Sequence, residues 1–111
     1  MYGFFAEYVS FQKTILSILD SEGNTIASRD VQIGKETFVQ SLTSDMVDLS
    51  HEQDLYHNDI FAIGVVVNPT KSLGWETEQQ FQKEIEKSFG FFAIVGEDSN
   101  KVAERLLSMA P

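Results

Sequence analysis

The chain has 111 residues, and its 42% hydrophobic and 23% charged content is ordinary for one globular domain with a real core. We therefore expect residues 1–111 to form a single domain. Acidic residues outnumber basic ones by 17 to 8, which gives a net charge of −9. Such a surface repels phosphate backbones, which argues against direct contact of this domain with nucleic acid.

Cysteine is absent from the sequence, which excludes disulfides, thiol catalysis and a cysteine-ligated zinc site. The apolar run over residues 61–67 is too short to span a membrane. The N-terminus lacks the basic region of a secretory signal peptide. Together these features favour a cytoplasmic protein without a membrane partner.

Three strands are predicted in the first third of the chain. Residues 2–9, YGFFAEYV, are rich in aromatic and β-branched types, and residues 10–12 form the turn to a second strand over residues 14–19. The sequence DSEGN at residues 20–24 is typical of a tight hairpin turn. A third strand over residues 25–31 completes an antiparallel meander.

The middle of the chain predicts a helix and a buried strand. Phe38, Leu42, Met46 and Leu49 form one apolar stripe within a helix over residues 35–49. Residues 50–58 are a polar connection, and the apolar run DIFAIGVVV at 59–67 is typical of a strand covered on both faces. Pro69 indicates a loop over residues 68–72.

The last third predicts helix, strand and helix. Phe81, Ile85 and Phe89 recur at four-residue spacing in a helix over 76–89, with Gly90 placed to end it. A short strand over 91–95 and a helix over 99–109 follow. The order βββαβαβα predicts an α/β fold: a five-stranded mixed sheet with helices on its faces, as in one lobe of the ribonuclease-H-like, actin-like ATPase fold.

The turn Glu97-Asp98-Ser99-Asn100 is the leading candidate site. A carboxylate and an amide at the carboxyl end of a strand, beside a helix N-terminus, are placed to meet a ligand in an open α/β sheet. The same residue types are also favoured as helix N-caps. Both interpretations, ligand contact and capping, therefore stay open.

Two further features have simpler interpretations. His51 and His57 are six residues apart in a polar connection, a spacing that fits no standard metal motif, so no metal site or cofactor is expected. Trp75 with Leu73 is expected to pack the entry of the helix that follows.

Four stretches resemble the ROK family of bacterial sugar kinases and sugar-responsive transcriptional repressors. ILDSEGNTIASRDV is similar to the family's second-to-third-strand hairpin, and DIFAIGVVVNP to its central strand and the following loop. LGW and FGFFAIVGEDSNKVAE resemble its later helix, strand and END-type sugar motif. The resemblance covers nearly the whole chain but only the N-terminal lobe of the family.

The resemblance implies roles for individual residues. Asp98 matches the family's catalytic base, Asn100 matches a later asparagine, and Glu97 stands where the family has a sugar-binding asparagine. Gly64 matches the glycine before the family's sugar-pocket loop. These four residues are therefore the candidate ligand-binding residues.

The phosphate-binding loop of the family is not kept. Where ROK kinases turn on a DxGGT-like sequence, this chain has Tyr8-Val9-Ser10-Phe11-Gln12. The acid and both glycines that let backbone amides approach phosphate are absent, and Phe11 is bulky. The resemblance therefore implies a lobe without ATP chemistry.

Three functions follow, in order of preference. The first is a catalytically inactive ROK-like lobe, part or remnant of a sugar-responsive transcriptional regulator, with a sugar as ligand. The second is a ligand-free interaction or dimerisation module, since nine Phe residues in 111 favour self-association or a missing second lobe. The third is half of a sugar kinase.

Overall fold

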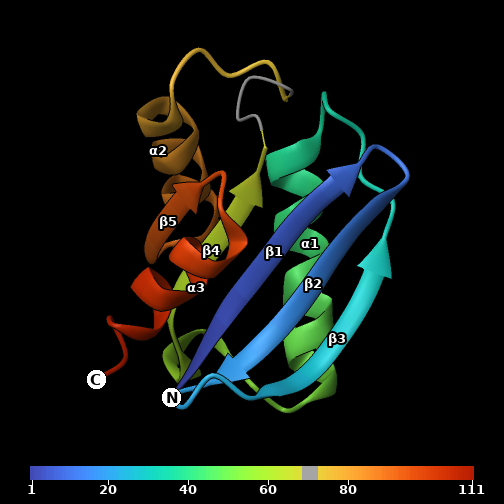
Figure 1. The fold of residues 1–111 in the computed structure, drawn as a ribbon. Coiled ribbons are helices and arrows are strands. Elements are labelled where there is room, and N and C mark those ends of the chain that lie inside the picture. The colour runs from blue at the N-terminus through green and yellow to red at the C-terminus, as the bar shows by residue number, and fades with distance from the viewer. Residues whose placement is uncertain (69–72) are drawn as a thin grey trace.

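The computed structural model describes residues 1–68 and 73–111, and these form one five-stranded mixed sheet with helices on both faces (Figure 1). The strand order across the sheet is β3-β2-β1-β4-β5. The predicted fold class is confirmed, including the order of every strand and α-helix along the chain.

The antiparallel half of the sheet is a meander. It comprises β1 (Tyr2–Ser10), β2 (Lys13–Asp20) and β3 (Thr25–Val31). Asp20 closes the β2–β3 turn: its carboxylate accepts the backbone N–H groups of Glu22 and Asn24, both at 2.9 Å. Gly23 supplies a φ of 92°, a value that favours glycine.

The parallel half of the sheet contains the buried centre. β4 (Ile60–Val67) pairs with β1 on one side and with β5 (Phe92–Gly96) on the other, both in parallel. From Ala62 to Val67 every residue of β4 is buried. The continuous apolar run is therefore explained by cover on both faces, as predicted.

The helices divide between the two faces. α1 (Phe38–Glu52) and α2 (Glu78–Phe89) pack together on one face, over the larger core around Phe4, Phe38 and Phe81. α3 (Ser99–Leu107) lies alone on the other face, against β1, β4 and β5 (Figure 1). A short 3₁₀ helix, His57–Asp59, leads into β4. Among the described residues no helix is long and apolar enough to cross a membrane.

The bounds of the helices differ from the prediction by a few residues. α1 starts at Phe38 and extends through Ser50 to Glu52, beyond the predicted end at Leu49. Ser50 is buried, and its hydroxyl donates to the carbonyl of Val47, so a polar residue continues the helix where a polar connection was expected. α3 ends at Leu107, two residues early. Most of the predicted 68–72 loop lies outside the described residues.

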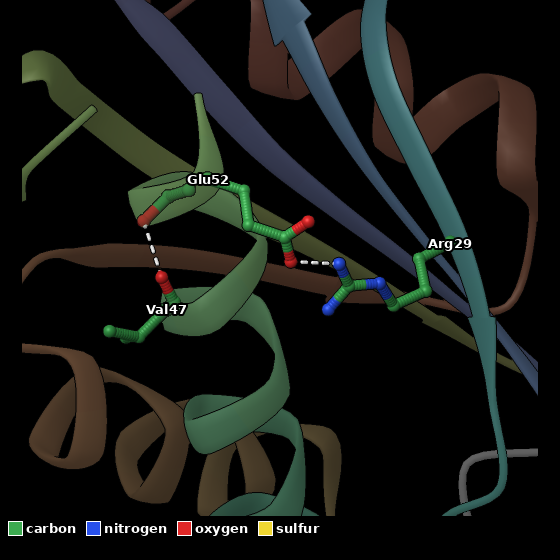
Figure 2. A network of polar contacts seen from close by, with 4 residues as sticks. Arg29, Val47 and Glu52 are labelled. Atoms are coloured by element: carbon green, nitrogen blue, oxygen red, sulfur yellow. Dashed lines mark hydrogen bonds and ion pairs between the residues drawn. The ribbon is translucent and has the colours of Figure 1, made fainter. Parts of the chain in front are cut away.

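An ion pair ties the last turn of α1 to the edge of the sheet. The guanidinium of Arg29 in β3 donates to the carboxylate of Glu52 (Figure 2). This contact raises the pKa of Arg29, first through the hydrogen bond to Glu52 and then through its charge. It gives Glu52 a partner on β3 at the protein surface, which helps explain why α1 continues past the apolar stripe.

We predict that replacing Asp20 with Ala lowers thermal stability near neutral pH. The hydrogen bonds from Asn24, first from its backbone and then from its side chain, lower the pKa of Asp20 below its ordinary value of 3.8. A group with a lowered pKa in the folded state stabilises the fold above its ordinary pKa, and that contribution is lost as the pH falls through the folded-state pKa.

Thermal melts of both proteins across the acidic range measure this effect. The difference in Tm between wild type and Asp20→Ala should be largest near neutrality and shrink as the pH falls below 3.8. A difference in Tm that does not change with pH would show that the carboxylate charge has no part in holding the turn.

Candidate functional site

The carboxyl ends of the three parallel strands meet at one edge of the sheet. Tyr8 of β1 is in register with Val67 of β4, and Val66 of β4 with Gly96 of β5. The β1–β2 turn and the Glu97–Asp98 turn therefore both project from this edge, on either side of β4. In open α/β sheets, ligands bind outside the carboxyl ends of strands.

Asp98 acts as the N-cap of α3. Its carboxylate oxygen accepts the backbone N–H of Lys101 at 3.0 Å, which satisfies one of the free amides at the helix start. The capping interpretation is confirmed. Asp98 remains exposed to solvent, so its other oxygen can still meet a ligand, and contact with a sugar stays a prediction.

The neighbours of Asp98 also lie at this edge. Glu97 is exposed and is engaged in an interaction of its own, and Asn100 is exposed in the first turn of α3. The structure thus brings three of the four predicted site residues together in one exposed acidic turn. A sugar-binding role for these residues stays a prediction.

Gly64, the fourth candidate, lies elsewhere. It is in the interior of β4 beside Ile94 of β5, with Val65, Val66 and Val67 between it and the carboxyl edge. A Cβ at this position would lie 2.9 Å from Cγ1 of Val102 in α3. Gly96 is similar, with a Cβ 2.8 Å from Cγ2 of the same valine. Both glycines let α3 approach the sheet closely.

The turn between β1 and β2 is the one that the family resemblance matches to a phosphate loop. Phe11 is 64% exposed at its tip, and Val9 just before it is 56% exposed. The Ser10 hydroxyl accepts the backbone N–H of Gln12 at 3.2 Å. The turn therefore presents a bulky ring and an amide already in use, where phosphate binding needs free amides and a close approach of the backbone.

The histidines and the tryptophan have packing partners. His51 packs against Tyr56 and His57 against Phe91, with ring centroids 5.0 and 5.4 Å apart. Among the described residues no group of three or more His, Cys, Asp or Glu side chains could hold a metal ion. Trp75 stacks on Phe81 of α2 at 5.7 Å, as expected of a residue that packs the helix entry.

One feature of this edge was missed from the sequence. A groove of about 590 Å³ lies between α2 and the N-terminal end of α1. Two separate segments, residues 35–40 and 73–75, line it together with three residues of α2. No local motif marks it, because it exists only once α1 and α2 pack side by side.

Comparison with known proteins supports the fold. The sequence matches no known protein family and no curated protein. Solved structures do match: YeaZ from Pseudomonas aeruginosa has a TM-score of 0.54 at 14% identity over 87% of this chain. The "Lmo2764 protein, a putative N-acetylmannosamine kinase, from Listeria monocytogenes" has a TM-score of 0.57 at 18% identity over 96% of this chain.

These matches define the class of the fold. The chain has an α/β fold of the ribonuclease-H-like, actin-like ATPase type, like that of a sugar kinase lobe. It spans 43% of the Pseudomonas chain and 39% of the Listeria chain, so each of those proteins is more than twice the length matched here. At these identities the likeness concerns the fold.

We predict that Gly64→Ala destabilises the protein by about 1–3 kcal/mol, the usual cost of overpacking a tight interior. The new methyl group would meet Val102 at 2.9 Å. Chemical denaturation measures the loss. In the double variant with Val102→Ala, the loss should be smaller than the sum of the two single losses, because the clash is removed.

Gly34→Ala is the matched control. A Cβ at Gly34 would meet nothing within 4 Å, so its effect should stay within about 0.5 kcal/mol. If the effects of Gly64→Ala and Val102→Ala were simply additive, Gly64 would not be serving the approach of α3.

Proposed function

We propose that this chain is a catalytically inactive lobe of the ROK type and that it belongs to a sugar-responsive transcriptional regulator. The observation that carries this proposal is the β1–β2 turn. The position that needs backbone amides open to phosphate carries Phe11, which is 64% exposed. A lobe with this turn cannot hold ATP phosphates in the way phosphoryl transfer requires.

The acidic turn favours a ligand at the same edge. Asp98 is held in a fixed geometry by its bond to Lys101 N–H, yet it stays open to solvent. A carboxylate fixed in this way is suited to accept a hydrogen bond from a sugar hydroxyl. Without a phosphate loop, such a contact would serve recognition and not catalysis.

The lengths of the matched structures support the idea of a single lobe. The chain covers about two fifths of each neighbour. In two-lobed proteins of this kind the ligand is enclosed when the lobes close. A second lobe, supplied by a further segment, another copy or another protein, is therefore part of the proposal. With a net charge of −9, this lobe would not itself contact DNA.

A second candidate function is an interaction module that binds no sugar. Val9 and Phe11 are both exposed at the β1–β2 turn, and exposed apolar side chains that cluster often mark protein contacts. Here the same turn that lost phosphate binding would instead dock a partner or a second copy. The third candidate, half of a sugar kinase, would require another chain to supply the phosphate site.

We predict that hexoses or amino sugars bind the chain weakly, and that Asp98→Asn reduces their affinity by about tenfold, the effect of weakening one charge-assisted hydrogen bond. Asparagine can still cap α3, so the fold should persist. Titration calorimetry with a sugar panel gives the affinities, and Asn100→Ser tests the neighbouring position.

The absence of binding by any sugar, including to a two-lobed assembly, would overturn the sugar-sensing proposal. Sedimentation then separates the alternative. Self-association of the wild-type chain, together with a monomeric Phe11→Ser variant, would favour the interaction module. A chain that stays monomeric at high concentration would contradict the module as well.

A further inference from the structure

The groove between α1 and α2 has an apolar floor and a charged rim. The floor is formed by Phe38 and Leu73, which are buried, and by Trp75, which is half-buried. The rim carries Lys35, Glu36, Glu84 and Lys87, all exposed. A volume of about 590 Å³ lies in the range of small-molecule sites, roughly 300–1,000 Å³.

Stacked rings hold the floor in place. Trp75 stacks on Phe81, Phe81 contacts Phe38, and Phe38 meets Tyr8 of β1 edge to face, with centroid distances of 5.7, 5.8 and 5.7 Å. Phe38 and Phe81 are almost fully buried. The apolar surface that a ligand would meet is thus fixed by the core, so binding would not have to order it.

The rim charges are balanced and free. Two lysines and two glutamates give no net charge locally, in a chain whose overall charge is −9. Within residues 1–68 and 73–111, none of the four forms an ion pair. Donors and acceptors of both signs are therefore open to a ligand that carries both signs itself.

We propose that this groove binds a zwitterionic small molecule with an apolar body, namely a free α-amino acid with a large aliphatic or aromatic side chain. Its ammonium group pairs with Glu36 or Glu84, and its carboxylate with Lys35 or Lys87. Its side chain covers the floor beside Trp75. A neutral sugar would leave the four charges without ionic partners, and an anion would meet the two glutamates.

This site is separate from the acidic turn. Glu97, Asp98 and Asn100 of the acidic turn do not line the groove. The groove and the proposed sugar contact can therefore be tested independently, and either can fail without the other. Trp75 is the only tryptophan in the sequence, so its fluorescence reports on the groove directly.

The test is a fluorescence titration of Trp75 with leucine and phenylalanine, excited where phenylalanine does not absorb. We expect saturable binding. N-acetyl-leucine lacks the ammonium charge and leucinamide lacks the carboxylate. Each should bind about tenfold more weakly, because each loses one charge-assisted contact. Titration calorimetry repeats the measurement, so a binding event that leaves the fluorescence unchanged is still detected.

Four variants assign the binding to the rim. The double variant Lys35→Gln/Lys87→Gln should weaken leucine and leave leucinamide unchanged, whereas Glu36→Gln/Glu84→Gln should weaken leucine and leave N-acetyl-leucine unchanged. Lys83→Gln on α2 and Glu104→Gln on α3 remove exposed charges outside the groove and should leave binding unaltered. Thermal melts check that each variant folds.

Three results would overturn the proposal: no binding of either amino acid by fluorescence or calorimetry, equal binding of the two single-charge analogues and the parent, or equal losses in rim and control variants. Binding of hexoses that depends on Asp98 and leaves Trp75 unchanged would support the sugar proposal alone. Hexose binding that depends on Lys87 and Glu84 would place a sugar in this groove and reject the amino acid.

Discussion

The parallel pairing of β1 with β4 is the constraint on which the rest of the molecule depends. It joins the antiparallel meander to the β–α crossovers and places β4 at the buried centre, with β5 beyond it. It also aligns the strand ends, so the β1–β2 turn and the acidic turn project from one edge. The candidate residues of the acidic turn and the Phe11 turn lie at this edge because of that register.

The small residues that face α3 explain how one short helix packs closely on β1, β4 and β5. Val102 of α3 packs so closely on Gly64 and Gly96 that a methyl group at either glycine would clash with it. This close contact fixes the start of α3, and with it the position of Asp98. The position of the carboxylate at the edge therefore depends on packing in the sheet interior.

The sequence predicted most of the fold because its patterns are local. The apolar run of β4, the four-residue spacing of Phe81, Ile85 and Phe89, and the turn at Asp20 each match the structure. It could not predict that Gly64 faces α3, since that contact joins residues far apart in the chain. For the same reason it missed the groove, whose lining comes from residues 35–40, residues 73–75 and α2. Ser50 and Glu52 extend α1 through polar contacts, and the apolar stripe of the helix gives no sign of these contacts.

On our proposal, this lobe keeps the fold of a sugar kinase lobe without its phosphate chemistry. Titration of the isotopically labelled chain with magnesium ATP, followed by backbone amide NMR, tests it most directly. We expect that the amides of residues 9–12 do not shift at any ATP concentration that leaves the protein folded. Saturable shifts in the Phe11 turn, or transfer of phosphate to a sugar, would contradict it.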